Sequence, residues 1–530
     1  MRIASKFLGR IALIRLRDLK LFENRRDKHV LIGVMCVFLA FVVVTIIATK
    51  GILHDDSYIT LRYAKNLVKY HQFTYNLDNP TYSLTTPLWA LVVAGFGWVS
   101  HDFVVVSQVL SVVFALIAAG LFYALSGCIV GSYALLPAVM FLLDPYLVGA
   151  NQAGNESPLF SLLGILSIYL VVRLKNYRFF NAIAPALAFA MLILTRPEGI
   201  VILMIVALFI LISLQHRTGI TFAAFLVLLT IVMLMPWLIF AALRFKTIIP
   251  TSLILKSYDS TKRLPFTDLI SMQRFIVLII RGYFPYLIVI AFAIGTLFSE
   301  WKKAIDWRGL LTPGRGTHAE NPSLNSQSVQ LLPPMLVFGM ILFYLAELKE
   351  KAIAGRYLLT FSPYLMLLAT QSIRALAGRF EGFKKRLAFI GAIIVCIVIF
   401  LNVAAVFSRS KRVSEGEAPR VDMGRWIARN ISSTAVIANF GGAGGIAYYF
   451  DGQAWDYDLI STMGRDIELA KRRRQGYRPE AREYFYKKLD YIVINVGSKK
   501  FDEVGPVAYQ NNTFKIIKVA NKNKAFGNDR

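Results

Sequence analysis

Residues 30–59 read VLIGVMCVFLAFVVVTIIATKGILHDDSYI, an apolar run that ends shortly before two adjacent aspartates. The run Val30–Thr49 can cross a bilayer as a helix, because crossing needs roughly 20 apolar residues. A core helix of a soluble protein would be shorter and would carry a polar stripe. Asp55 and Asp56 follow where the chain leaves the run. The stretch therefore predicts a membrane helix whose end presents an acidic pair.

The rest of the chain repeats this apolar pattern. Hydrophobic residues make up 56% of its 530 residues, whereas soluble domains contain about 45–50%. Further apolar runs lie at 86–99, 103–126, 130–150, 158–173, 180–196, 199–214, 219–242, 273–298, 331–348, 357–372 and 387–408. The run 86–99 is short and contains Pro87, Gly95 and Gly97, so we expect it to lie at the outer surface without crossing. We therefore predict an all-α polytopic membrane protein with about 11 transmembrane helices.

The basic residues lie mostly between the apolar runs. The formal net charge is +27, and membrane proteins concentrate Lys and Arg in cytoplasmic loops, so the charge indicates no nucleic-acid partner. Residues 1–29 hold nine Lys and Arg against three Asp and Glu, ahead of an apolar run too long for a cleaved signal peptide. We expect a cytoplasmic N-terminus over 1–29, a membrane domain over 30–408 and a small extracytoplasmic α/β domain over 409–530. The outer loop 50–102 would face the same side as that domain.

The acidic pair is followed by a helical stretch with a basic face. Arg62, Lys65 and Lys69 recur at spacings of three and four, so they share one side of the helix. A carboxylate near a basic face suits a general base that works beside a bound phosphate. An aspartate before a helix also caps the backbone N–H groups of its first turn. Position alone leaves both readings open.

The order of residues in this loop narrows the choice. The motif is Asp55-Asp56-x-Tyr58-Ile59-x-x-Arg62-Tyr63-x-x-Asn66-Leu67, followed by Tyr75-Asn76 and Thr86-Pro87-Leu88-Trp89. It resembles the first outer loop of the GT-C superfamily and, within it, the terminal arabinofuranosyltransferases of actinobacterial cell walls. In that family an acid of the pair is assigned to catalysis, so the resemblance implies this role for Asp55 and Asp56. The segment 77–84 is shorter here than its counterpart in the family.

Three later segments resemble family patterns as well, namely Gly154-Asn155-Glu156-Ser157-Pro158-Leu159, Thr195-Arg196-Pro197-Glu198-Gly199, and Pro250-Thr251-Ser252 with Lys256. Ionisable groups at span boundaries are costly unless they are paired or hydrated. Arg244, Lys256 and Arg356 are basic residues on the expected outer side, where a lipid phosphate needs cationic partners. Mutual pairing of Arg196 with Glu198, or snorkelling of Arg356, is the structural alternative. The predicted substrate-binding residues are Tyr58, Arg62, Glu156, Arg196, Glu198, Arg244, Lys256 and Arg356.

The resemblance implies an inverting glycosyltransferase of the cytoplasmic membrane. Its donor would be a polyprenyl-phosphate-linked sugar, and its acceptor an extracytoplasmic glycan, lipid or protein. Some members of the superfamily use a divalent metal, which Asp55 and Asp56 could hold, although nothing in the sequence requires a cofactor. The alternatives are a flippase for a lipid-linked sugar and a non-catalytic scaffold. Transporters place charges near the bilayer midplane and often contain internal repeats, whereas here the charges gather at the outer boundary and no repeat is seen.

The C-terminal region contains a glycine-rich turn. Residues Gly442–Ala447 fit the pattern G-x-G-x-x-A after a strand-like run, a pattern that can indicate dinucleotide binding. The region is too short for a full doubly wound domain. We therefore expect these glycines to form a turn in a small domain.

Overall fold

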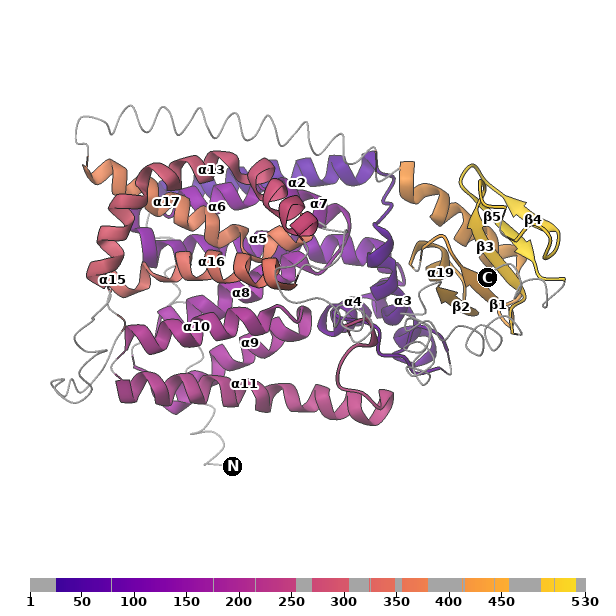
Figure 1. Cartoon of the computed structure of the whole chain (residues 1–530), viewed down its shortest axis with the longest axis horizontal. Coiled ribbons are helices and arrows are strands. Elements are labelled where there is room, and N and C mark those ends of the chain that lie inside the picture. Colours follow the sequence, from indigo (N-terminus) through magenta and orange to yellow (C-terminus); the bar gives the residue numbers. More distant parts are fainter. Residues whose placement is uncertain are drawn as a thin grey trace.

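The computed structural model describes residues 25–77, 79–174, 176–214, 216–253, 269–304, 324, 326–347, 355–379, 412, 415–442, 444–456, 488–499 and 501–520. A bundle of helices forms the larger part, and a small sheet with short helices lies at one end of it (Figure 1). The span predicted at 387–408 lies outside the described residues.

Five helices in the described part of the chain are long and apolar enough to cross a membrane. They lie in α2 (Arg25–Ala48), α5 (Phe103–Val130), α11 (His216–Phe245), α13 (Leu269–Ala304) and α16 (Leu332–Glu347). Other helices of the bundle are α4 (Pro87–Ser100), α8 (Ser157–Val172), α9 (Ile183–Thr195), α10 (Gly199–Ser213) and α17 (Ser362–Arg379). The predicted helical membrane architecture is confirmed at this level.

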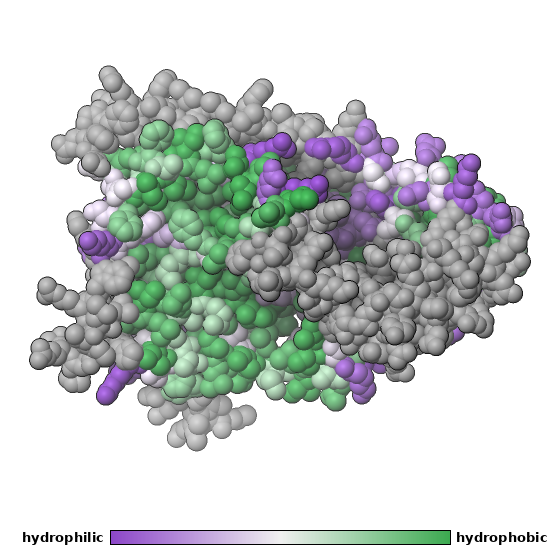
Figure 2. Space-filling view, in the orientation of Figure 1, coloured by the Kyte–Doolittle hydropathy of each residue, from purple (hydrophilic) through white to green (hydrophobic). Residues whose placement is uncertain are grey.

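The outer surface of the bundle is apolar. On α5, Val105, Val109 and Ile117 are exposed at helical spacing, whereas Ala115 and Phe122 are fully buried. Figure 2 shows hydrophobic residues over the bundle and hydrophilic ones where it meets the C-terminal part. A contiguous apolar surface of this extent is not stable in water, so these side chains face lipid.

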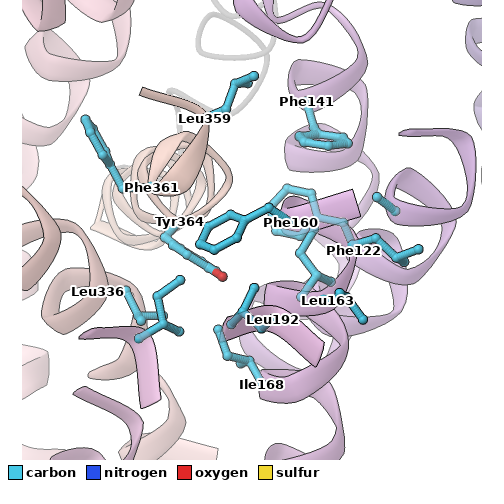
Figure 3. Packing of buried hydrophobic residues seen from close by; sticks show 14 of the residues in the cluster. Phe122, Phe141, Phe160, Leu163, Ile168, Leu192, Leu336, Leu359, Phe361 and Tyr364 are labelled. Atoms are coloured by element: carbon cyan, nitrogen blue, oxygen red, sulfur yellow. The ribbon is translucent and has the colours of Figure 1, made fainter. Parts of the chain in front are cut away.

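The interior of the bundle is closely packed around α8. Figure 3 shows Phe160 and Leu163 of α8 between Phe122 of α5 and Tyr364 of α17. These side chains are almost completely buried. A helix that is apolar on all sides is typical of the centre of a membrane bundle.

One predicted span is broken in two. The prediction of a single span over 130–150 was wrong, because α6 (Leu135–Leu142) ends before Asp144 and α7 (Pro145–Gln152) begins after it. Asp144 caps α7 by accepting from the Tyr146 N–H at 2.8 Å, and it accepts from the Tyr283 hydroxyl at 3.0 Å. Aspartate before a helix and proline in its first turn are both strong start signals. These bonds allow a carboxylate that is only 1% exposed.

Two sets of polar contacts mark opposite ends of the bundle. At one end, Arg374 of α17 pairs with Glu300 of α13 at 3.6 Å and donates to the Ile129 carbonyl at 3.0 Å. At the other end lie α3 (Asp55–Tyr70), α4 and the turns that precede α8, α10 and α17. In Figure 1, α3 and α4 lie together at the end that meets the sheet.

The C-terminal part is a small α/β unit. A helix over 415–430 precedes a five-stranded sheet. The strands are β1 (Val436–Asn439), β2 (Gln453–Asp456), β3 (Tyr491–Asn495), β4 (Val507–Gln510) and β5 (Phe514–Lys518), in the order β2-β1-β3-β5-β4. β1 is parallel to β2 and β3, and β5 is antiparallel to β3 and β4. Three of the strands, β1, β3 and β5, lie in the apolar runs at 435–440, 491–496 and 514–519. The short helix α19 (Gly445–Tyr449) connects β1 to β2.

Candidate active site

The acidic pair opens α3 but does not cap it. Position N-cap is held by His54, whose side chain makes no capping bond, and Asp55 and Asp56 form the first turn. Negative charge there interacts favourably with the helix dipole. Consecutive helical residues point about 100° apart, so the two carboxylates face different parts of the molecule.

Asp55 faces the C-terminal part of the chain. Its Oδ1 atom accepts from the backbone N–H groups of Gly444 and Gly445, at 3.1 and 2.7 Å. Burial raises the pKa of Asp55, and the Gly445 N–H bond offsets this only partly. The Asp55 carboxylate is thus hydrogen-bonded to the backbone of the glycine turn.

Asp56 faces the end of the bundle at which α3 and α4 lie. Its Oδ2 atom lies 2.8 Å from Nη1 of Arg356, and its side chain is 48% exposed. Arg356 belongs to the short helix η3 (Gly355–Thr360), just before α17. The Nε atom of Arg356 is buried and donates to no acceptor within the described residues. Because the side chains of Arg356 and Asp56 are 28% and 48% exposed, this ion pair is accessible to a further ligand.

Three further charged side chains form a buried set of ion pairs close to Arg356 and Asp56. Arg196 is 2.8 Å from Glu198 and 3.3 Å from Glu156, and its side chain is only 6% exposed. The ring of Tyr357 lies between the two arginines, with its centre 5.4 Å from the guanidinium carbon of Arg196 and 5.6 Å from that of Arg356. We call Asp56, Glu156, Arg196, Glu198 and Arg356 the rim cluster. The structure brings together these five residues from the ten that the sequence selected.

The rim cluster is not uniform in charge. Burial alone would raise the pKa of Glu198, but the charge of Arg196 and its hydrogen bond outweigh burial and hold that pKa below its usual value. Arg196 forms ion pairs with two carboxylates, as the pairing alternative predicted, whereas among the described residues Arg356 forms an ion pair with Asp56 and interacts electrostatically with Glu156. Arg356 is therefore the cation of the cluster with capacity for a new anion.

Arg62 lies elsewhere and is almost completely buried, at 2% exposure. Its donors reach the carbonyls of Tyr75, Phe450 and Gly452 at 2.6 to 2.7 Å, the carbonyl of Ala447, and the Oδ1 atom of Asn76 at 3.1 Å. Buried polar groups of this kind are stabilised by being fully hydrogen-bonded. The geometry favours a structural role for Arg62 over the phosphate contact that the sequence predicted.

The neighbours of Arg62 on α3 also contact the C-terminal part. Lys65 donates to the Tyr448 carbonyl at 2.5 Å, and Lys65 and Lys69 pair with Asp451 at 3.0 and 2.6 Å. Tyr58 packs its ring 5.3 Å from that of Tyr448. The prediction that the basic residues share one helical face is confirmed, but this face contacts the C-terminal part of the chain. We call the docking surface the set Asp55, Tyr58, Arg62, Lys65, Lys69 and Asn76.

One of the predicted phosphate ligands, Arg244, is not part of the rim cluster. Arg244 is exposed near the end of α11, and no contact within the described part of the chain joins it to Arg356 or Arg196. Lys256 lies outside the described residues. The preceding Thr251 donates its N–H to the Tyr82 carbonyl at 2.6 Å, which ties this segment to the outer loop.

The acidic pair does not form a joint metal site. Asp55 is directed to the glycine turn and Asp56 to Arg356. Among the described residues, no three His, Cys, Asp or Glu side chains converge as metal ligands would. The arrangement supports proton transfer and anion binding.

Two features of the site were missed at the sequence level. Tyr357 separates the two arginines of the rim cluster, and only its place directly after Arg356 could have indicated it. The glycine turn contacts Asp55 although it comes 389 positions later in the chain. No spacing rule relates segments that are so far apart.

Neither a family model nor a curated protein sequence matches this chain. Solved structures do match it. The glycosyltransferase ArnT from Cupriavidus metallidurans, bound to undecaprenyl phosphate, superposes with a TM-score of 0.58 at 12% identity, over 92% of this chain and 99% of that one. The oligosaccharyltransferase of Archaeoglobus fulgidus superposes with a TM-score of 0.53 at 9% identity, over 86% of this chain and 69% of that one. The chain therefore has the same overall fold as these two proteins, in agreement with the predicted GT-C-like architecture.

Proposed function

We propose that this protein is a membrane glycosyltransferase that moves a sugar from a polyprenyl-phosphate-linked donor to an extracytoplasmic acceptor. The observation that carries the proposal is the pairing of Asp56 with Arg356 at the end of an apolar helical bundle. The fold adds support, because ArnT has the same fold and was crystallised with undecaprenyl phosphate.

The rim cluster fits a lipid-linked donor for a physical reason. Such a donor needs apolar surface for its prenyl chain and a cation at the depth of its phosphate. Apolar helices supply the first, and the partly exposed guanidinium of Arg356 supplies the second. A guanidinium can donate two parallel hydrogen bonds to a phosphate. Arg196, held by Glu156 and Glu198, would support Tyr357 and thereby the position of Arg356.

Asp56 is the proposed general base. It would accept the proton of an acceptor hydroxyl, whose oxygen forms a bond to C1 of the sugar. The bond between C1 and the phosphate oxygen breaks, and its electron pair leaves with the polyprenyl phosphate. Attack on the face opposite the phosphate would invert the configuration at C1.

The ion pair would couple the two halves of this step. While Asp56 is charged, it neutralises Arg356. When it takes up the proton it becomes neutral, and the guanidinium is then available to the leaving phosphate. Charged groups interact strongly in a site shielded from water. Arg356 therefore gains the leaving phosphate as its anionic partner while negative charge develops on that phosphate.

The proposed topology follows the positive-inside bias. The N-terminus would be cytoplasmic, α4 would lie at the outer surface, and the rim cluster and the C-terminal part would be extracytoplasmic. Arg244 and Lys256 stay predicted contacts to the lipid phosphate. Labelling of a cysteine placed at Asp56 from one side of sealed vesicles tests the sidedness, and reaction only from the cytoplasmic side would contradict it.

The decisive experiment compares purified protein with an Asp56→Asn variant, using radiolabelled polyprenyl-phosphate sugars and cell-envelope acceptors. Asn keeps the size of the side chain but cannot accept a proton, so transfer should fall roughly 10²–10⁴-fold, as is typical when a general base is lost.

Asp102→Asn is the matched control. Asp102 caps α5 at the same end by accepting from the Val104 and Val105 N–H groups, and asparagine caps equally well, so activity should be unchanged. Full activity of Asp56→Asn would refute the proposed base. Movement of labelled lipid across the membrane without product would indicate a flippase instead.

A further inference from the structure

We infer that Asp55 is a positioning residue, through which the glycine turn of residues 441–445 aligns the first turn of α3 and so directs Asp56 to Arg356. The inference rests on the proposed function and adds a role for the C-terminal part within the active site.

The first support is the bonding of Asp55. One carboxylate oxygen accepts from two successive N–H groups, those of Gly444 and Gly445, which begin α19. Arg420 also holds the turn by donating from Nε to the Gly441 carbonyl at 2.6 Å. The start of α3 is thus fixed to a turn that is itself held in place.

The second support is the close approach that glycine permits. A Cβ atom on Gly444 would lie 1.7 Å from the Asp55 carbonyl oxygen, so no other residue fits there. Gly442 has a φ of +133°, a backbone conformation that residues with a side chain rarely adopt. A Cβ atom there would lie 3.0 Å from both carboxylate oxygens of Asp55. The glycine pattern is therefore accounted for by contact with α3, without a dinucleotide.

The third support is the periodicity of α3. Asp55, Tyr58, Arg62, Lys65 and Lys69 follow one another at spacings of three and four, which places them on one helical face. All five contact residues 444–451 or their neighbours. Asp56 is one position off this face. Anchoring the face at both ends therefore sets the direction in which Asp56 points.

Substitution of Asp55 separates a positioning role from a catalytic one. Asn can still accept from the two N–H groups but cannot take up a proton, whereas Ala can do neither. A displacement of about 1 Å at a reacting group can cost roughly 10²-fold in rate. We expect kcat to fall by about that much in Asp55→Ala, with the KM for the donor little changed.

Asp55→Asn should recover most of this loss. Neutral hydrogen bonds are about half as strong as charged ones, so activity within about tenfold of the unaltered protein is expected. Because burial raises the pKa of Asp55, the amide also avoids the cost of holding a charge beneath the turn. If Asp55→Asn were as inactive as Asp55→Ala while both stayed folded, Asp55 would be a catalytic group and the inference would be overturned.

A pair of glycine variants tests the same contact from the opposite side. Gly444→Ala should lower kcat as Asp55→Ala does. Gly497→Ala is the control, because a Cβ there meets nothing within 4 Å. Equal activity of the two variants would overturn the inference.

Hydrogen exchange provides a readout that is independent of catalysis. The amides of Gly444 and Gly445 should exchange faster in Asp55→Ala, but not in Asp55→Asn or Gly497→Ala. Unchanged exchange in Asp55→Ala would overturn the inference even if transfer were observed. Faster exchange without any sugar transfer by the unaltered protein would uphold the contact and refute the proposed function.

Discussion

The docking surface and the rim cluster both use residues of α3, and each contains an arginine and an aspartate, but the two regions differ in how completely the protein satisfies them. Arg62 is 2% exposed and donates to five protein acceptors. The side chain of Arg356 is 28% exposed, and its Nε atom has no acceptor in the described part of the chain. An arginine with a full set of protein partners stabilises a fold, whereas one with unused donors beside an exposed carboxylate can bind a ligand.

The largest expected effect lies at the docking surface. In Arg62→Lys, the ammonium group offers three donors without the planar fork of arginine, so it cannot replace all five hydrogen bonds of Arg62. A hydrogen bond to a charged group contributes about 1.5–3 kcal/mol, and the loss of two should weaken the contact by about 3–6 kcal/mol. Limited proteolysis of residues 444–454 measures this.

Arg429→Lys is the control for that prediction, because Arg429 is exposed in the C-terminal part. Its digestion pattern should match that of the unaltered protein. Unchanged protection of 444–454 in Arg62→Lys would show that Arg62 is not needed for docking, and its earlier assignment to the phosphate would regain support.

A smaller effect is expected at the rim cluster. Hydrogen bonds to charged groups contribute about 1.5–3 kcal/mol, so Arg356→Ala should raise the KM for the polyprenyl-phosphate donor roughly 10- to 100-fold. Arg356→Lys should recover part of this loss, because it restores the charge but not the fork. Arg374→Ala, at the opposite end of the bundle, should leave the KM unchanged. Equal KM values for Arg356→Ala and Arg374→Ala would show that Arg356 does not bind the donor.

The smallest expected effect concerns the ion pairs of Lys65 and Lys69 with Asp451, at the partly exposed edge of the docking surface. Burial raises the pKa of Asp451, but the charges and hydrogen bonds of Lys65 and Lys69 outweigh it and lower the pKa to about 2. Since the pKa of the folded state lies below that of the unfolded state, the stabilisation is complete above about pH 4 and is lost toward pH 2. Partly exposed ion pairs contribute about 0–1 kcal/mol.

Thermal unfolding of the unaltered protein and of Asp451→Asn measures this contribution. The variant should be slightly less stable at pH 7, and the difference should vanish by about pH 2. A difference that stayed constant across this range would mean that the ion pairs are not its cause.

Hydropathy and charge predicted most of the helices, because a bilayer imposes the same length and polarity on every span. They failed at 130–150, where Asp144 and Pro145 start a new helix inside an apolar run. Residues Glu156, Arg196 and Glu198 could be selected because ionisable groups near a membrane need partners. The different contacts of Asp55 and Asp56 could not be predicted, because they depend on the rotation of α3 against a turn 389 residues away.

The fully buried guanidinium of Arg62 has a consequence for biosynthesis. Synthesis from the N-terminus exposes Arg62 and Asn76 long before Phe450 and Ala454, which satisfy them. During that interval the first outer loop holds a cation without its final partners at the membrane surface. The loop therefore reaches its working shape only after nearly the whole polypeptide has been translated, and a prematurely terminated chain would present it to the quality-control proteases.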